Sequence, residues 1–234
     1  MGAASPKQYL PLAGRPMLYH AVGCLAVAPV ESVFVVLAPD DTTFAQHDWS
    51  EFDGRLEPLY CGGDTRRDSV YNGLVAAMAA VDADDWVLVH DAARPCLPRA
   101  DLERLVAQVS SDRVGGLLAL PVSDTVKRAA ETSAGSDQDA HQAVRVAGTE
   151  DRASLWLAQT PQMFRAGLLA EALRLAKGAV TDEASAVEQM GLQPRLVVGS
   201  RQNLKVTYAE DLVIAQAILV AQGARTSAAR GALA

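Results

Sequence analysis

Short apolar runs recur along the chain and are separated by stretches with helical spacing. Three runs are rich in β-branched, aromatic or aliphatic residues and lie at 33–37, 86–90 and 114–122. They are apolar on both faces, which is typical of strands that helices cover on both sides. Because helical patterns alternate with these runs, the sequence predicts an α/β fold with a mostly parallel sheet and crossover helices.

The helical patterns also predict where the domain ends. Residues 69–80 and 102–109 carry apolar side chains at helical intervals. Near the C-terminus, Thr207 and Glu210 have the spacing of a capping box ahead of the apolar stretch 212–220. No second core is evident, so we expect one domain over residues 1–222 and a flexible C-terminal tail over 223–234.

The segment from Asp124 to Arg152 follows a different pattern. Two short strand-like runs, 125–128 and 143–146, flank a polar tip that contains glycine and serine. This pattern predicts a β-ribbon that projects from the domain. A lone two-stranded ribbon is marginally stable in water, so we expect this β-arm to pack on a second copy of the chain.

Composition narrows the classes of function. The 234 residues carry a formal net charge of −7, which disfavours sequence-independent binding to nucleic acid or to an anionic membrane. No apolar run approaches the roughly 18 residues of a membrane span, and the first ten residues lack the apolar core of a signal peptide. The three cysteines are widely spaced, which favours a reducing cytoplasm over a disulfide framework or a zinc site.

Familiar catalytic motifs are missing from the sequence. There is no HExxH, CxxC, GxGxxG or Walker sequence and no spacing typical of a Ser–His–Asp site. The four histidines (His20, His47, His90 and His141) are scattered, and we interpret each as structural or superficial.

Polar clusters instead follow the predicted strands. Ligands of open α/β sheets bind beyond the carboxyl ends of strands, so these clusters are candidate site segments. Each also has a plain structural explanation: a solvated turn, a strand-to-helix turn, a structural ion pair, a proline that ends a strand, helix N-terminal charges, or a lysine on a short edge strand. In chain order the clusters are 5–10, 61–69, 89–95, 158–162, 181–185 and 203–207.

Taken together, the clusters form a recognisable series. PKQYL, GGDTRRDSV, VHDAARP, DTVKR, TPQMF, TDEASA and NLKVT occur in this order across residues 1–219. The series closely resembles the 2-C-methyl-D-erythritol 4-phosphate cytidylyltransferase family of the non-mevalonate isoprenoid pathway. The resemblance implies a Rossmann-like nucleotidyltransferase sheet, Mg²⁺, and transfer of CMP from CTP to methylerythritol phosphate with release of pyrophosphate. It also implies a homodimer that exchanges β-arms, which segment 124–152 matches.

The resemblance further implies which residues form the site. Those expected at the reacting phosphates are Lys7, Lys205 and Arg152. Those expected at the nucleotide are Gly63, Asp64, Ser69, Asp91 and Ala92. Those expected at the acceptor are Asp91, Arg94, Thr125, Arg152 and Thr160, with Thr125 and Arg152 supplied by the partner subunit. No residue is assigned as a metal ligand.

The chemistry of phosphoryl transfer explains this set of residues. A phosphate monoester has a second pKa of about 6, so it can attack the α-phosphorus without a general base. The transition state needs in-line positioning and positive charge around the phosphoryl oxygens. Lysines supply mobile charges, and Arg152 can grip a phosphate with two hydrogen bonds. Mg²⁺ bridges the triphosphate and keeps much of its water, so a protein cage is not required.

The sequence departs from the family at its start. The family begins with an apolar strand and a glycine-rich loop, PAAGxGxRM, directly before PKQYL, whereas Met1 aligns with the end of that loop. We expect the natural start roughly 20 residues upstream, the length of a strand plus its loop. Without that strand, the neighbouring strand edges should be exposed, and the chain should fold poorly or bind CTP weakly.

Two other functions fit the same residues. A ribitol-5-phosphate cytidylyltransferase would share the fold and the chemistry with a different acceptor. A non-catalytic dimerising remnant would fold and pair but bind no CTP. The joint presence of Lys7, Asp91, Arg94, Arg152 and Lys205 favours an enzyme over the remnant.

Overall fold

A computed structural model describes residues 6–130 and 144–231. The helices are α1 (Met17–Leu25), α2 (Arg66–Ala77), α3 (Arg99–Val109), α4 (Ala166–Leu175), α5 (Glu183–Glu188) and α6 (Ala209–Gly231), with short 3₁₀ turns at Lys7–Tyr9, Phe44–Gln46 and Ser50–Phe52. The strands are β1 (Pro11–Leu12), β2 (Arg15–Pro16), β3 (Val33–Val36), β4 (Leu56–Leu59), β5 (Trp86–Val89), β6 (Gly115–Pro121), β7 (Lys127–Ala129), β8 (Val146–Thr149), β9 (Trp156–Arg165) and β10 (Arg195–Val198).

The central sheet is mixed, which corrects the expectation of a mostly parallel sheet. Its strand order is β10-β6-β9-β5, with β10 parallel to β6 and with β9 antiparallel to both β6 and β5. The reason is the β-arm: the chain leaves β6 at Pro121, runs through the arm and returns as β9 with Trp156 opposite Pro121. A strand that returns beside its predecessor in this way is antiparallel to it.

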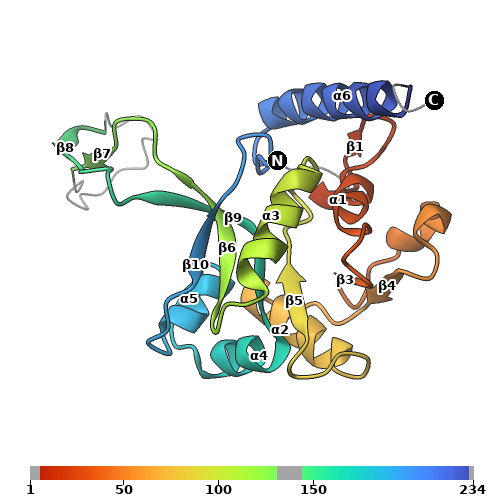
Figure 1. The fold of residues 1–234 in the computed structure, drawn as a ribbon, viewed down its shortest axis with the longest axis horizontal. Coiled ribbons are helices and arrows are strands. Elements are labelled where there is room, and N and C mark those ends of the chain that lie inside the picture. Colours follow the sequence, from red (N-terminus) through yellow and green to blue (C-terminus); the bar gives the residue numbers. More distant parts are fainter. Residues whose placement is uncertain (1–5, 131–143, 232–234) are drawn as a thin grey trace, which may run out of the picture.

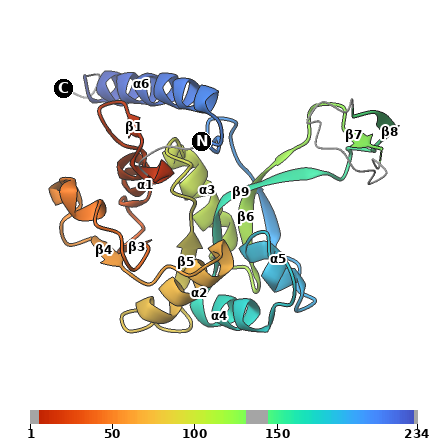
Figure 2. The same ribbon diagram turned by 180° about the vertical axis from the view of Figure 1, so that it is seen from behind.

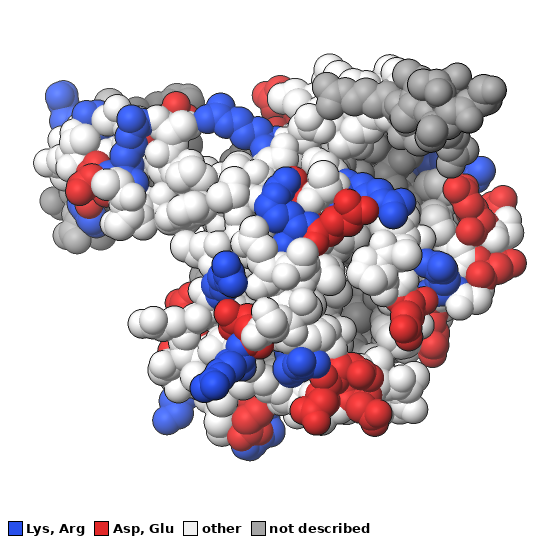
Figure 3. Space-filling model, in the orientation of Figure 1, with Lys and Arg blue, Asp and Glu red and all other residues white. Residues whose placement is uncertain are grey.

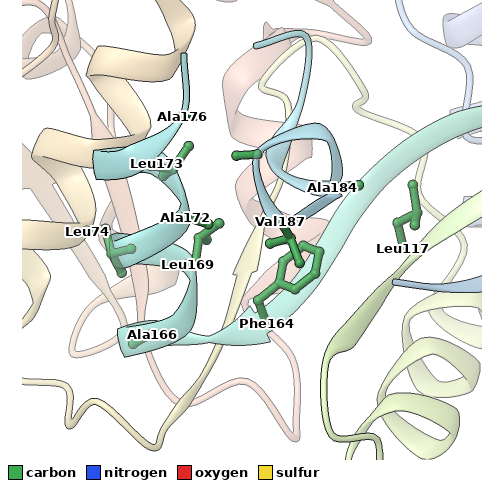
Figure 4. Close-up of a cluster of buried hydrophobic side chains, with 11 residues drawn as sticks. Leu74, Leu117, Phe164, Ala166, Leu169, Ala172, Leu173, Ala176, Ala184 and Val187 are labelled. Atoms are coloured by element: carbon green, nitrogen blue, oxygen red, sulfur yellow. The ribbon is translucent and has the colours of Figure 1, made fainter. Parts of the chain in front are cut away.

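Helices cover both faces of this sheet, as the doubly apolar strands require. On one face Phe164 of β9 and Leu117 of β6 pack against α2, α4 and α5, with Leu169, Leu173 and Val187 fully buried (Figure 4). On the other face the neighbouring residues of the same strands, Met163 and Leu118, pack against α3. Alternation along each strand thus supplies two separate cores.

A second, parallel pair, β3 and β4, lies apart from the central sheet. Among the described strands, β3 pairs only with β4, and the outer edge of β5 pairs with none. An apolar cavity of about 520 Å³ separates them and is lined by residues 33–37 and 87–89.

The β-arm projects from the body, as predicted (Figures 1 and 2). Strands β7 and β8 form its antiparallel ribbon, with Lys127 opposite Thr149 and Arg128 opposite Gly148. The predicted first run, 125–128, overlaps β7, whereas the predicted second run, 143–146, meets β8 only at Val146. The polar tip between the strands, 131–143, lies outside the described residues.

Two helix boundaries differ from the predictions. Helix α2 begins at Arg66 because the Thr65 side chain caps it by accepting a hydrogen bond from the Asp68 amide. At the start of α6 the predicted Thr207–Glu210 capping box is wrong: the carboxylate of Asp211 accepts the amides of Thr207 and Tyr208 instead. Helix α6 also continues to Gly231, so residues 223–231 extend the helix rather than begin a tail.

Candidate active site

The large cavity is polar at one end, where several of the predicted segments meet. Its lining there includes five of the predicted site residues, namely Lys7, Ser69, Asp91, Ala92 and Lys205, together with Arg66. They come from the first 3₁₀ turn, the N-terminal part of α2, the loop after β5 and the loop before α6. The carboxyl end of β5 therefore carries the site, as the rule for open α/β sheets predicts.

Asp91 is the centre of a charged cluster. Its Oδ2 accepts a hydrogen bond from Lys205 Nζ at 2.8 Å, and its Oδ1 accepts bonds from Arg66 Nε and one terminal guanidinium nitrogen at 3.1 and 3.0 Å. The Arg94 guanidinium lies 3.9 Å from Oδ2. Arg66 also grips the buried carboxylate of Glu183 with two bonds of 2.7 and 3.0 Å. Three cations thus surround two carboxylates, which leaves one excess positive charge for an anionic ligand.

The protonation of this cluster follows from its surroundings. Burial alone would raise the pKa of Asp91, but the hydrogen bond from Lys205 and the charges of Arg66 and Lys205 outweigh burial and hold the pKa below its ordinary value. Burial raises the pKa of Glu183, against the opposing effect of Arg66. Asp91 is therefore a carboxylate at neutral pH and cannot serve as a general acid.

A bulge in β9 places Thr160 where it can hydrogen-bond to the loop that carries Asp91. The pairing of β6 with β9 shifts register between Leu117 and Ala119, and this irregularity accommodates Pro161 inside the strand. The prediction that this proline ends the strand is therefore wrong, since β9 continues to Arg165. Thr160 is buried there, and its hydroxyl accepts the Asp91 amide at 3.0 Å and meets His90 Nδ1 at 3.0 Å.

The loop that carries Lys205 is held by the protein interior. It contains no strand, which corrects the prediction of a short strand at 203–207. Buried Arg94 donates to the Asn203 backbone carbonyl at 2.6 Å, and the Asn203 side-chain Nδ2 donates to the Thr160 carbonyl at 2.7 Å. The Val206 backbone amide donates to the Ala93 carbonyl at 2.8 Å. Arg94 thus directs its guanidinium to this loop rather than into the cavity.

The glycine-rich turn before α2 is shaped by close contacts. A Cβ on Gly63 would lie 2.5 Å from Asp68 Cβ, and one on Gly62 would lie 2.9 Å from the Leu37 carbonyl oxygen. The Gly63 amide donates to Ser69 Oγ at 3.0 Å, which ties the turn to the first turn of α2. Gly63 and Asp64 are exposed beside the cavity lining. The tight turn brings backbone N–H groups to a helix N-terminus, where anions bind readily.

Thr125 and Arg152 lie elsewhere. Both are exposed at the base of the β-arm and neither lines the cavity. Within the single chain, the structure therefore does not bring these two predicted acceptor contacts together with Lys205 and Asp91.

Comparison with known proteins decides the family. The model of the 2-C-methyl-D-erythritol 4-phosphate cytidylyltransferase family matches residues 1–221. The chain belongs to this family. The resemblance inferred from its motifs is confirmed.

Individual members show how close the relationship is. The chain is similar to the 2-C-methyl-D-erythritol 4-phosphate cytidylyltransferase of Laribacter hongkongensis (58% identity; 94% of this chain, 90% of that protein) and to that of Dechloromonas aromatica (56% identity; 94% and 92%). It also resembles a crystal structure of 4-diphosphocytidyl-2C-methyl-D-erythritol synthase, with a TM-score of 0.79, 39% identity, and coverage of 92% of this chain and 95% of that one.

Three residues of this candidate site were not assigned to it from the sequence. Arg66 and Glu183 lie in segments that were singled out, but only the fold shows that they join across 117 positions. His90 was interpreted as structural, and it does hold the loop: Nε2 meets the Arg94 carbonyl at 3.0 Å while Nδ1 meets Thr160. Burial lowers the pKa of His90 to about 4, so the ring is neutral. The VHDAARP motif was the available signal for its role.

Three further findings bear on the class of protein. Within residues 6–130 and 144–231, no helix combines the length and the apolar character needed to cross a membrane. In the same residues, no three His, Cys, Asp or Glu side chains gather as a metal site would require. On the face shown in Figure 3, Lys and Arg side chains are interspersed with Asp and Glu rather than joined in one basic surface.

Proposed function

We propose that this chain transfers CMP from CTP to the phosphate of 2-C-methyl-D-erythritol 4-phosphate, giving 4-diphosphocytidyl-2-C-methyl-D-erythritol and pyrophosphate. The observation that carries the proposal is the cluster of Lys205, Arg66 and Asp91 at the polar end of the cavity, with Lys7 in the same lining. Family membership over residues 1–221 supports the same reaction.

The reaction needs charge and alignment rather than a proton acceptor. The acceptor phosphate attacks the α-phosphorus of CTP, and the bond from that phosphorus to the β-phosphate oxygen breaks with its electron pair leaving on pyrophosphate. Because Asp91 is ionised and held by cations, its part is to orient Lys205. Lys205, Lys7 and Arg152 neutralise the charge that develops on the phosphoryl oxygens.

The nucleotide would bind against the turn at 61–65 and the start of α2. Ser69 Oγ is within 3.0 Å of the Gly63 amide and of the Thr65 carbonyl, which keeps this turn in one shape. We assign Gly63, Asp64, Ser69, Asp91 and Ala92 to the nucleotide and Arg94 and Thr160 to the acceptor side. The hydrogen bonds of Arg94 and Thr160 indicate that these two residues act on the acceptor side by holding the loops that carry Asp91 and Lys205 in place.

Mg²⁺ would enter the site bound to the nucleotide. The carboxylates of the cluster, Asp91 and Glu183, are already bound by cations, so the described residues offer no cage of their own. The ion would be held by the triphosphate oxygens and water, as Mg²⁺ prefers, and would supply further positive charge.

We propose a homodimer formed through the β-arm. Apolar side chains are exposed along the edge strand β10 and at the root of the arm, with Leu157 59%, Val198 51% and Leu196 45% exposed. Large apolar side chains exposed in one region are typical of an interface. A partner's arm would bring Thr125 and Arg152 to the acceptor phosphate, since neither lines this chain's own cavity.

The acceptor is tested by direct competition. Pyrophosphate release from CTP is compared with methylerythritol phosphate and with ribitol 5-phosphate, at equal concentrations. We expect kcat/KM to favour methylerythritol phosphate by at least about 100-fold, and a preference for ribitol 5-phosphate would replace it as the acceptor. The absence of CTP binding by a folded dimer would instead support the non-catalytic remnant.

The proposed site of action is the cytoplasm. The three cysteines, Cys24, Cys61 and Cys96, are all free thiols, which suits a reducing compartment.

A further inference from the structure

Arg66 uses its whole guanidinium group inside the protein. Its two terminal nitrogens bind the two oxygens of Glu183, and Nε with one terminal nitrogen binds Oδ1 of Asp91. The side chain of Glu183 is 1% exposed and that of Asp91 12%, whereas Arg66 is 36% exposed. Arg66 therefore joins a buried anchor on α5 to the carboxylate that faces the cavity.

This geometry divides the two oxygens of Asp91 between two partners. Oδ1 is bound by Arg66, and Oδ2 is bound by Lys205, whose side chain is 47% exposed, while Arg94 lies farther from Oδ2, at 3.9 Å. Arg66 is fixed by Glu183, whereas Lys205 has no second carboxylate partner among the described ion pairs. Of the two cations, Lys205 is thus the one that can turn toward a ligand.

A phosphate dianion entering the site would compete with Asp91 for Lys205. If Lys205 moved to the phosphate, Asp91 would remain at the cavity wall as a carboxylate repelling the same phosphate, unless another cation stayed on it. Arg66 is placed to be that cation, because its bonds to Oδ1 do not depend on Lys205.

We propose that Arg66, anchored by Glu183, is a positioning residue that keeps Asp91 fixed and compensated and so releases Lys205 to the substrate phosphate. The inference rests on the proposed cytidylyl transfer for its catalytic consequence. An arginine is required at this place, because its planar fork binds two carboxylates at once and a lysine ammonium does not reproduce that geometry.

The kinetic test is a double-mutant cycle on the full chain. Arg66→Gln should lower kcat/KM for methylerythritol phosphate by roughly 30-fold, with KM for CTP changed by less than about threefold. In an Asp91→Asn background the same substitution should have almost no further effect, because Arg66 acts through Asp91. A loss of equal size in both backgrounds, or a loss of thermal stability alone, would overturn the proposal.

Arg99 offers a matched control. It is the first residue of α3, as Arg66 is of α2, and it forms an exposed ion pair with Glu103 at 2.8 Å. Arg99→Gln should leave both kinetic constants unchanged. If Arg66→Gln does not fold, Glu183→Gln replaces it: this variant keeps a neutral acceptor on α5 and should lower kcat/KM in the same direction by a smaller factor.

A second readout does not depend on turnover. The rate at which acetic anhydride acylates Lys205, followed by mass spectrometry, should fall roughly fivefold in Arg66→Gln, because Lys205 is then the one cation at hydrogen-bond distance from Asp91 among the described ion pairs, Arg94 being 3.9 Å away. The rate should recover in the Arg66→Gln/Asp91→Asn variant. An unchanged rate in Arg66→Gln would refute the positioning role, whereas the expected rates without any CMP transfer would leave that role standing and refute the proposed reaction.

Discussion

At the scale of single residues, Lys205 carries the most direct prediction. It is the exposed cation on Asp91, and its loop is pinned by Arg94 and Asn203, so replacing the side chain removes a charge and little packing. We expect Lys205→Met to lower kcat about 100-fold, measured by pyrophosphate release, with an unchanged melting temperature. Lys177→Met, at an exposed lysine after α4, is the matched control. Equal activity of the two variants would contradict the assigned role.

The buried ring of His90 should make the free energy of unfolding depend on pH. Its pKa falls from the ordinary 6.5 to about 4, because burial opposes the charged ring. Between these values the unfolded chain binds a proton that the folded chain excludes, so the stabilising effect is present above pH 6.5 and is lost as the pH falls toward 4. The loss should reach up to about 3 kcal/mol in urea unfolding. His90→Asn should flatten this slope, and an unaltered slope would place the titration elsewhere.

The site could be predicted from the sequence only in part. Motifs marked Lys7, Ser69, Asp91, Ala92 and Lys205, and the structure brings these together in one cavity. They did not reveal the Arg66–Glu183 pair, because an ion pair across 117 positions depends on how α2 and α5 pack into the same core on one face of the sheet. The sequence also could not show that the Arg94 side chain turns away from the cavity, since this depends on its hydrogen bond to the carbonyl of Asn203 in a distant loop.

At the scale of elements, the turn before α2 is a tightly constrained segment of the site. Gly63→Ala would force a Cβ to within 2.5 Å of Asp68, so the turn must open. We expect KM for CTP to rise about tenfold and the free energy of unfolding to fall by about 1–3 kcal/mol. Gly223→Ala is the control, because a Cβ there meets nothing within 4 Å, and it should leave KM unchanged. A similar KM for both variants would exclude this turn from the nucleotide site.

The elements themselves were easier to predict than their arrangement. The apolar runs correctly gave β3, β5 and β6, since composition and length distinguish strands well. The direction of β9 was not readable, because it follows from the return of the β-arm rather than from local pattern. The prediction that Pro161 ends the strand was wrong for a related reason, because only the pairing with β6 shows that a bulge accommodates this proline.

At the scale of the whole molecule, the proposed dimer predicts complementation between inactive variants. Arg152→Ala and Lys205→Met should each be nearly inactive, yet a refolded equal mixture should recover about one quarter of wild-type activity, because half the dimers then hold one intact site. Lys7→Met mixed with Lys205→Met is the control and should recover none, since both residues serve the same protomer's site. Failure of the first mixture would mean that Arg152 serves its own chain.

The proposed reaction, transfer of CMP to methylerythritol phosphate in the cavity at the end of β5, can be followed directly. The most direct test incubates the full chain at micromolar concentration with CTP, Mg²⁺ and methylerythritol phosphate and follows the products by ³¹P NMR, beside the Asp91→Asn variant. We expect the two phosphorus signals of a cytidylyl diphosphate ester together with pyrophosphate, and a much slower appearance of both in the variant. A folded chain that binds CTP and methylerythritol phosphate but yields neither product, or a variant that yields as much as the parent, would contradict it.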